Sequence, residues 1–398
     1  MQGLSDRMSA EEMAEYVKQK LAEAEERKDE ASVLVEMPDA SILERYLQAQ
    51  MPGVSDLAVR NLERISYGAA REHYSFDATW REGTGEVTRG YVLLRDHDLP
   101  QGVLPHYAVM TDPGSFWVQG KGDREREFLT LTCLEKTGVP APRARWLDLT
   151  GAWLERPFTI HEKAVGQVAP SFTLLGLEDE QQRAAIARQF VEVLAAIHSV
   201  PWQEMGLSAL GAPKVGSDEY ASMAVECLDL RVAASCPERP PMLQAALNWL
   251  RENRPSLHNV ALCHGDYKTD NFMFEGDRLT AVLDWEFAHL GDPVEDLGAS
   301  CMGLHATNGL CMGLMAREEF LKGYERRAGR SVDRELVKFW EIFYDVRMTS
   351  FCYTMMAGSK EFMEAAPELP PWVDQAAMEA FWLSMVNRLL EDLEVRLR

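Results

Sequence analysis

The feature that most restricts the fold of this chain is a β-rich segment, residues 261–293, inside an otherwise helical second half. Its sequence, ALCHGDYKTDNFMFEGDRLTAVLDWEFAHLGDP, alternates short apolar runs with turn-forming residues, a pattern typical of short strands. Helical periodicity surrounds it, at residues 178–200, 218–235, 240–253, 316–328, 333–357 and 375–398. Residues 56–166 read as strands around one helix. The whole pattern predicts an α+β fold.

Three polar side chains in this segment have spacings that suit a metal site. Asn271 follows Asp266 by five positions, and Asp284 follows Asp266 by eighteen. A hairpin around residues 275–277 would return the chain so that Asp284 faces Asn271. This cluster contains two carboxylates and one amide oxygen, which are hard oxygen ligands of the kind that Mg²⁺ uses. One of the two carboxylates would be left to orient a substrate hydroxyl. The alternative interpretation is a polar turn that uses these side chains for local backbone hydrogen bonds.

The order of motifs in this region resembles a known enzyme family. His264-Gly265-Asp266, Asn271, Asp284-Trp285-Glu286, Gly291-Asp292-Pro293 and Asp296 occur in sequence. They resemble the catalytic core of the aminoglycoside phosphotransferase/choline kinase-like family, in the branch that includes the kinase-like domain fused to some acyl-CoA dehydrogenases. This resemblance implies a bilobal protein-kinase-like fold, with a small β-rich N-lobe and a large, mostly helical C-lobe.

The resemblance also implies roles for these residues. Asp266 would be the catalytic base or the carboxylate that orients the hydroxyl, and Asn271 and Asp284 would hold Mg²⁺. His264 and Asp296 would support the catalytic loop structurally.

The nucleotide-binding half of the resemblance rests on other positions. Gly68, in ISYGAAREHYSFDA, resembles a small-residue loop over the phosphates, and Glu127 resembles the helix glutamate that pairs with a basic strand residue. Arg95, in YVLLRD, is the candidate for that basic residue. If Leu94 fills the position instead, Arg95 points to the other face of the strand.

Two further expectations concern the same lobe. Glu125 is a rival for the role of Glu127, two residues away and nearly opposite on a helix. The backbone near Glu162 and Ala164, in RPFTIHEKAVG, would meet adenine at the hinge between the lobes.

The resemblance divides the chain into three parts. Residues 1–54 are expected to form an N-terminal helical extension, 55–165 the N-lobe, and 166–398 the C-lobe. Within the C-lobe, the catalytic loop would occupy 262–300 and the helical acceptor region 301–398. Arg347 stands out in the apolar stretch FWEIFYDVRMTSF, because a buried arginine needs an anionic partner; Asp345 could supply it.

The composition excludes some partners. Across 398 residues, 41 Lys+Arg against 63 Asp+Glu give a net charge of −22, which argues against nucleic-acid binding. No secretory signal or long apolar window is visible, so no membrane partner is expected. The seven cysteines form no CxxC pair, which favours a cytoplasmic protein with reduced thiols.

The prediction is therefore an ATP- and Mg²⁺-dependent phosphotransferase acting on a small-molecule hydroxyl acceptor. Two alternatives stay open: a kinase-fold nucleotide-binding or regulatory protein without transfer activity, and a metal-dependent hydrolase. The resemblance is compatible with aminoglycosides, choline-like amines, macrolides, amino-alcohols, sugars and hydroxyacyl compounds as acceptors.

Overall fold

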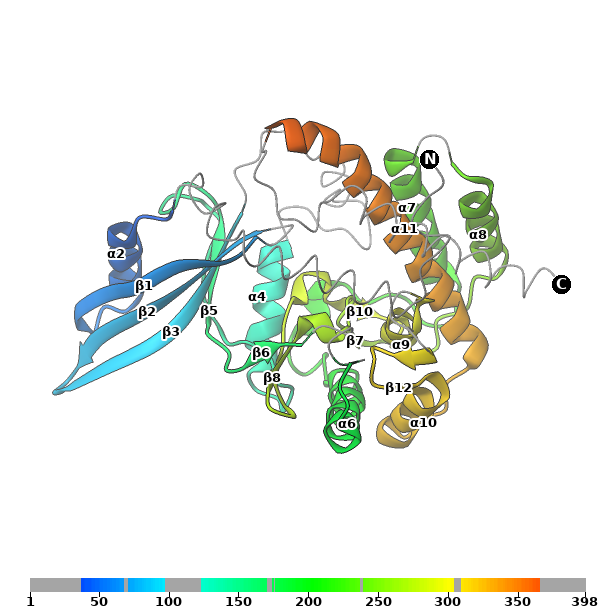
Figure 1. Cartoon of the computed structure of the whole chain (residues 1–398), viewed down its shortest axis with the longest axis horizontal. Helices are drawn as coiled ribbons and strands as arrows, with labels where there is room; N and C mark the ends of the chain where they lie inside the picture. Colours follow the sequence, from blue (N-terminus) through cyan, green and yellow to red (C-terminus); the bar gives the residue numbers. More distant parts are fainter. Residues whose placement is uncertain are drawn as a thin grey trace.

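Two lobes of different composition make up the structure (Figure 1). The computed structural model describes residues 37–67, 71–96, 123–169, 174, 176–236, 239–303 and 309–365. The smaller lobe is a β-sheet with flanking helices, and the larger lobe is mostly helical with three small sheets. The α+β class predicted from the sequence pattern is confirmed.

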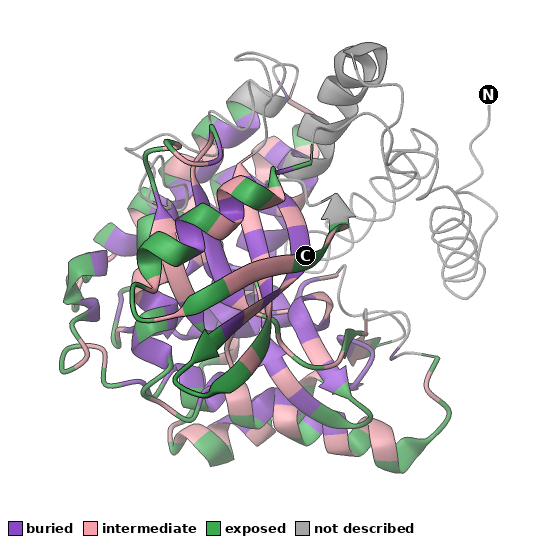
Figure 2. Ribbon diagram, turned by 90° about the vertical axis from the view of Figure 1, so that its left-hand side faces the viewer, coloured by how far each residue is buried: buried purple, intermediate pink, exposed green. Residues whose placement is uncertain are grey.

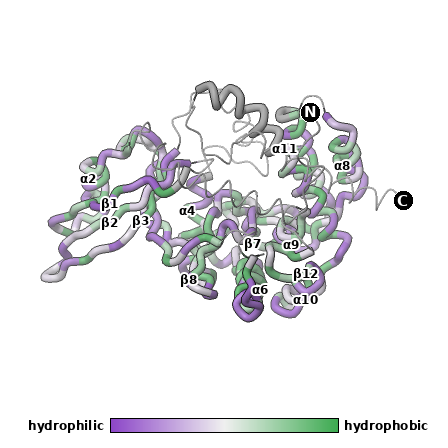
Figure 3. Tube along the Cα trace, viewed as in Figure 1, coloured by the Kyte–Doolittle hydropathy of each residue, from purple (hydrophilic) through white to green (hydrophobic). Residues whose placement is uncertain are grey.

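The smaller lobe is built on a five-stranded antiparallel sheet with the order β1-β2-β3-β5-β4. Its strands are β1 (Ser55–Tyr67), β2 (Arg71–Glu82), β3 (Gly85–Asp96), β4 (Ala144–Asp148) and β5 (Phe158–Glu162). The β2–β3 hairpin pairs without interruption from Arg71–Asp96 to Glu82–Gly85, and Gly83 takes a positive φ of 61° at its tight turn. Hydrophilic residues predominate at the far end of this hairpin (Figure 3).

Two helices flank this sheet. In α2 (Ala40–Gln50), the side chain of Asp39 caps the first turn by accepting a hydrogen bond from the backbone N–H of Ser41. Leu43, Tyr46 and Leu47 of α2 pack with inward-facing residues of the strands in one hydrophobic core. In α4 (Asp123–Leu134), Leu131 and Leu134 instead join the core of the larger lobe, so α4 connects the two lobes.

The larger lobe is a set of packed helices: α6 (Glu180–Ile197), α7 (Glu219–Ser235), α8 (Pro241–Glu252), α9 (Val294–Cys301), α10 (Arg317–Ala328) and α11 (Arg334–Ala365). In α6, Ile186, Phe190 and Leu194 recur every fourth residue and form a buried stripe. Figure 2 shows buried residues gathered in the interior and exposed residues on the outward faces. In the described part of the chain, none of the helices is long and apolar enough to cross a membrane.

Short strands and turns lie among these helices and hold the polar motifs. The strands are β6 (Gln167–Val168), β7 (Ala261–Cys263), β8 (Phe272–Glu275), β9 (Arg278–Val282), β10 (His289–Gly291), β11 (Leu310–Cys311) and β12 (Met315–Ala316). The 3₁₀ turns are η2 (Leu207–Leu210), η3 (Thr269–Asn271) and η4 (Trp285–Phe287). The predicted hairpin around residues 275–277 is present as β8–β9, with Gly276 at a φ of 64°.

Most of the helices expected from periodicity are present. Helix α9 was not anticipated, because all of its residues from Val294 to Cys301 are buried and it has no polar face to reveal a helical period. Three expectations lie outside the described residues: the first 36 residues of the N-terminal helical extension, the helix at 375–398, and the phosphate-covering turn at Gly68.

Candidate active site

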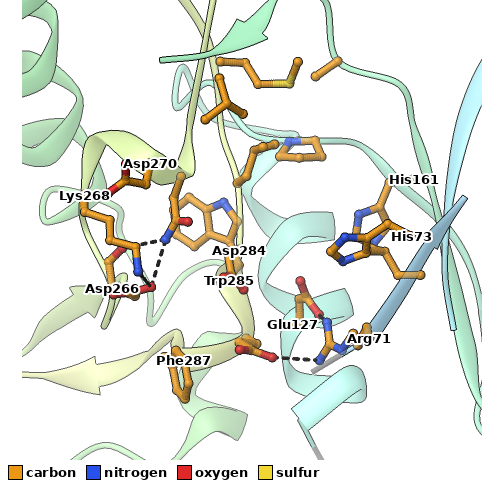
Figure 4. A pocket seen from close by; sticks show the side chains of 18 of the residues that line it. Arg71, His73, Glu127, His161, Asp266, Lys268, Asp270, Asp284, Trp285 and Phe287 are labelled. Carbon is orange, nitrogen blue, oxygen red and sulfur yellow. Dashed lines mark hydrogen bonds and ion pairs between the residues drawn. The ribbon is translucent and has the colours of Figure 1, made fainter. Parts of the chain in front are cut away.

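A cavity of about 670 Å³ opens between the two lobes. Strands β2, β3 and β5 and helix α4 line it from the smaller lobe. From the larger lobe, the cavity is lined by the loop at residues 264–271, which we call the HGD loop. The start of η4 and helices α7 and α11 complete this side. Figure 4 shows Asp266 and Lys268 on one wall, Arg71 and Glu127 on the other, and Asp284 between them. The cavity therefore gathers chemistry-bearing residues from both halves of the chain.

The carboxylate of Asp266 is held by two neighbours within the HGD loop. Lys268 Nζ lies 2.7 Å from Asp266 Oδ2, and Asn271 Nδ2 donates to the same oxygen at 3.0 Å. Asn271 Nδ2 also donates to the backbone carbonyl of Asp266 at 2.9 Å. Burial alone would raise the pKa of Asp266, but Lys268 and Arg347 more than offset it and lower the pKa well below its usual range. Asp266 is therefore an anion at neutral pH.

The HGD loop is anchored from behind by α9. The backbone N–H groups of His264 and Gly265 donate to the two carboxylate oxygens of Asp296, at 2.7 and 2.8 Å. His198 Nε2 lies 3.1 Å from Asp296 Oδ2, and His264 Nε2 lies 2.9 Å from the carbonyl of Leu283. His264 and Asp296 therefore brace the loop through hydrogen bonds and do not face the cavity.

Gly265 allows the HGD loop to approach η4 closely. Its φ is +82°, and a Cβ added at this position would lie 2.5 Å from the carbonyl oxygen of Phe287. A side chain is excluded both by the backbone conformation and by the contact. The HGD tripeptide thus needs its glycine for packing.

Asp284 comes directly after the β8–β9 hairpin, which returns it to the HGD loop. The backbone N–H of Leu283 donates to the carbonyl of Asn271 at 2.6 Å, and Asp284 adopts a left-handed φ of 61°. The side chain of Asp284 is exposed to the cavity, and the walls of that cavity surround it. Burial, Asp266 and Glu127 together raise its pKa to about 6.

Asp284 and Asn271 offer a donor set that fits a divalent cation. Asp284 presents a carboxylate to the cavity beside Asn271. Because Asn271 uses its amide nitrogen to hold Asp266, its amide oxygen is directed elsewhere and can serve as a ligand. The carboxylate–amide oxygen pair, with room for waters and phosphate oxygens, is the kind of site that Mg²⁺ occupies. Burial is the largest cause of the raised pKa of Asp284, and the neighbouring carboxylates that raise it further would also favour a bound cation.

Glu127 pairs with a basic residue that the sequence analysis did not single out. The guanidinium of Arg71, at the start of β2, donates to Glu127 Oε2 and lies 3.6 Å from Glu286 Oε2. Burial opposes the charge on Arg71, but Glu127 and Glu286 more than offset it and raise the arginine's pKa. Burial and Asp284 raise the pKa of Glu286 to about 8. This Arg71–Glu127–Glu286 cluster crosses from β2 through α4 to η4.

Arg95 does not take that position. Its Nε donates to Glu72 Oε2 at 2.8 Å, on the face of β3 that also carries Tyr91 and Leu93 and that packs toward α2. Leu94 lies on the opposite face and lines the cavity. The structure therefore matches the alternative in which Leu94 occupies the basic position. Strand side chains alternate, so a displacement of one residue moves the guanidinium from the cavity into the core.

The remaining nucleotide-lobe candidates lie as follows. Glu127 is buried at the cavity wall, while its rival Glu125 is exposed. Glu162 and Ala164 line the cavity where the chain passes from β5 toward the larger lobe. Glu162 also binds Arg145 Nε at 2.8 Å, which fixes this hinge against β4.

Part of the cavity wall comes from residues 301–398, the region that the sequence analysis expected to form the acceptor pocket. Met302, Tyr344 and Arg347 line it. Asp345 is buried away from it and accepts a hydrogen bond from the backbone N–H of Gly303, at 3.2 Å.

The cavity residues that the sequence analysis did not single out include Arg71, Lys268 and Arg231. For Lys268, its place two residues after Asp266 was the available signal. For Arg71, the signal was strand parity, because Arg71 and His73 alternate with core residues Tyr74 and Phe76. Arg231 shows no local pattern that points to a site.

Comparison with known proteins supports the same interpretation. A family model described as the phosphotransferase enzyme family matches residues 90–340. Acyl-CoA dehydrogenase family member 10 of Mus musculus is 32% identical over 284 residues, which cover 69% of this chain and 26% of that protein. The chain thus corresponds to about a quarter of this relative's length.

Solved structures share the fold. A protein of Ralstonia eutropha provisionally described as an aminoglycoside phosphotransferase superposes with a TM-score of 0.61 at 22% identity, covering 88% of this chain and 99% of that one. The GDP complex of aminoglycoside 2′-phosphotransferase-IIIa gives a TM-score of 0.51 at 16% identity, covering 88% and 99%. The protein-kinase-like fold implied by the sequence resemblance is confirmed.

Proposed function

The chain belongs to the phosphotransferase enzyme family, and on that premise we propose that it transfers the γ-phosphate of ATP to a hydroxyl group of a small molecule, with Mg²⁺. The observation that carries this proposal is the single cavity that brings together Asp266, the Asp284–Asn271 donor pair and the Arg71–Glu127–Glu286 cluster. Positioning and charge stabilisation are what phosphoryl transfer requires of a protein.

Asp284 and Asn271 would hold Mg²⁺, which when bound neutralises charge on the nucleotide phosphates. The excess of carboxylates around Asp284 supports cation binding, because each raises the cost of leaving Asp284 ionised without a counter-ion. Glu162 and Ala164 at the hinge would place the adenine end of the nucleotide, on the opposite side of the cavity from Asp266. Gly68 stays a proposed phosphate-covering residue.

Asp266 would orient the acceptor hydroxyl. One of its oxygens is already occupied by Lys268 and Asn271, so the other is the acceptor available to a substrate O–H. Its low pKa makes Asp266 a weak base at neutral pH. It would therefore align the hydroxyl in the ground state and receive the proton late, as a loose phosphoryl-transfer transition state allows.

Lys268 and Arg71 would supply the positive charge around the transferring group. Lys268 lies beside Asp266, where the attacking oxygen and the γ-phosphate meet. Arg71 reaches the cavity from β2, close to the position that Leu94 occupies without a charge. Because one guanidinium group can bind two phosphate oxygens at once, Arg71 would replace the missing basic residue of β3.

A second candidate function is nucleotide binding without transfer. The observation that favours it is Leu94, an apolar side chain where a basic residue is expected. Arg71 argues against it by restoring a cation to the same cavity. The experiment below separates the two.

The test compares isosteric variants at the two aspartates. Asp266→Asn is expected to lower turnover by about 100- to 10,000-fold while ADP·Mg²⁺ still raises the melting temperature. Asp284→Asn is expected to abolish the Mg²⁺-dependent part of that rise. Turnover is measured as ADP release from ATP with a panel of hydroxyl compounds, and the phosphorylated product is identified by mass spectrometry.

The control is Asp277→Asn, an exposed aspartate at the tip of the β8–β9 hairpin, which should behave as wild type. Undiminished turnover in the Asp266 variant would overturn the assignment. Nucleotide binding without transfer to any acceptor would favour the second candidate.

A further inference from the structure

Two arginines face the acceptor end of the cavity from neighbouring helices. Arg231 lies on α7 and Arg347 on α11, and the two helices pack against each other (Figure 1). Their side chains are largely buried; the residues are 8% and 7% exposed. Two positive charges therefore lie within one largely enclosed region, where repulsion between them is weakly screened.

Arg347 is fixed next to the proposed catalytic aspartate. Its Nη1 donates to the carbonyl of Gly265 at 3.1 Å, and Gly265 immediately precedes Asp266. Its guanidinium lies 4.6 Å from the ring centre of Phe287 and 5.3 Å from that of Tyr344. Two aromatic rings and one carbonyl hold the group rigidly, so the guanidinium is preorganised at the cavity wall.

Arg347 has no ion pair with a carboxylate among the described residues. Asp345, the partner considered from the sequence, is engaged with the backbone N–H of Gly303. Asp266 lies close enough for Arg347 to lower its pKa, but its bound cation is Lys268. The charge of Arg347 is thus directed to the cavity and to the edge of the HGD loop.

Arg231 adds a second charge from the facing helix. Burial, and then repulsion from Arg347, lower its pKa to about 9. An anion placed near both guanidiniums would reduce that repulsion. The charge in this part of the cavity is opposite to that around Asp284 and Glu286.

We propose that Arg231 and Arg347 form the binding site for an oxyanion group, carboxylate or phosphate, carried by the hydroxyl acceptor. This inference rests on the proposed phosphotransferase function and names the substrate class. Because Arg347 contacts the residue before Asp266, an anion bound there leaves the acceptor's hydroxyl only a few bonds away, within reach of Asp266. A polycationic acceptor would be repelled from the same position.

The test measures ligand binding separately from turnover. Isothermal titration in the presence of ADP·Mg²⁺ compares 3-hydroxybutyrate and sn-glycerol 3-phosphate with their uncharged counterparts, 3-hydroxybutyramide and glycerol, and with the cation choline. At least one anion is expected to bind about tenfold or more tightly than its uncharged counterpart. The preferred anion identifies the group as carboxylate or phosphate.

Variants connect that preference to the two arginines. Arg231→Gln and Arg347→Gln should each weaken binding of the anion by about 10- to 100-fold, because each removes a charge-assisted contact. Arg347→Lys should retain part of the affinity. The control is Arg326→Gln, an exposed arginine on α10, which should bind as wild type. An unchanged response of the melting temperature to ADP·Mg²⁺ establishes that each variant is folded.

The outcomes separate this inference from the proposed function. Anion binding that depends on both arginines supports the oxyanion site, even if no phosphate transfer is detected. Phosphate transfer itself is tested separately by the Asp266→Asn variant. If no compound binds more tightly to wild type than to the double Arg231→Gln/Arg347→Gln variant, the oxyanion site is overturned. Preference for choline over both anions would overturn it as well.

Discussion

At the scale of single residues, strand alternation decides which arginine faces the part of the cavity where we propose that a nucleotide binds. Arg71 and Arg95 lie at the same end of the β2–β3 hairpin, but strand alternation directs Arg71 to Glu127 and Arg95 to Glu72. Both pairs are buried, and both would be expensive to break. Only the Arg71 pair borders the cavity where a nucleotide would lie.

This difference predicts opposite effects for two similar substitutions. Arg71→Gln should raise the KM for ATP by about 10- to 100-fold, since a charged contact to phosphate is lost. Arg95→Gln should leave that KM unchanged and lower the free energy of unfolding by about 2–4 kcal/mol, since Glu72 loses a buried partner. Steady-state kinetics and urea denaturation measure the two effects. A raised KM in the Arg95 variant alone would contradict the assignment.

At the scale of elements, the position of Asp266 depends on packing between the HGD loop and its neighbours. Helix α9 holds the loop through Asp296, and η4 approaches it at Gly265. Helix α9 carries no amphipathic signal, so its contribution could be read from the sequence only through the motif that contains Asp296. The geometry of the HGD loop therefore depends on the loop itself, on α9 and on η4.

Two glycine substitutions separate close packing from backbone conformation. Gly265→Ala combines a φ of +82° with a Cβ only 2.5 Å from the Phe287 carbonyl. It should reduce turnover at least tenfold and lower the free energy of unfolding by about 2–4 kcal/mol. Gly276→Ala has a comparable φ of +64° but open space around the new Cβ, so it should cost about 1 kcal/mol and leave turnover intact. Equal effects on turnover would argue against the packing role.

At the scale of the whole molecule, the two lobes contribute carboxylates to one enclosed region. Asp266, Asp284 and Glu286 come from the larger lobe and Glu127 from the smaller. Burial, together with repulsion among these carboxylates, raises the pKa of Asp284 and Glu286. Arg71, between the lobes, offsets part of this charge. A bound cation would offset more of it, so metal binding and proton binding compete here.

That competition predicts a pH dependence. In the metal-free protein, raised pKa values near 6 and 8 mean that the stability contributed by Asp284 and Glu286 is present at low pH and is lost as the pH rises through those values. Binding of Mg²⁺ requires ionised Asp284, so the rise in melting temperature caused by ADP·Mg²⁺ should grow from pH 5.5 to pH 7.5. Differential scanning fluorimetry across this range measures both trends. In Asp284→Asn the growth should vanish, and a pH-independent response in wild type would contradict the account.

The sequence by itself determined the parts of this protein that local spacing specifies. The HGD loop, the β8–β9 hairpin and the placement of Asp284 beside Asn271 all lie within about twenty residues, so turn chemistry and strand length decide them. The family resemblance, the two-lobed fold and the choice of Glu127 as the helix residue that meets a basic partner followed from motifs in the same way.

Only the tertiary structure decided which residues meet across the cavity. Arg71 and Glu127 are 56 positions apart, and their pairing depends on strand parity, sheet register and the packing of α4 against the larger lobe. Arg231 and Arg347 lie on separate helices and come together only because α7 packs on α11. Such contacts depend on how whole helices and strands pack, and a short segment of sequence does not predict that packing.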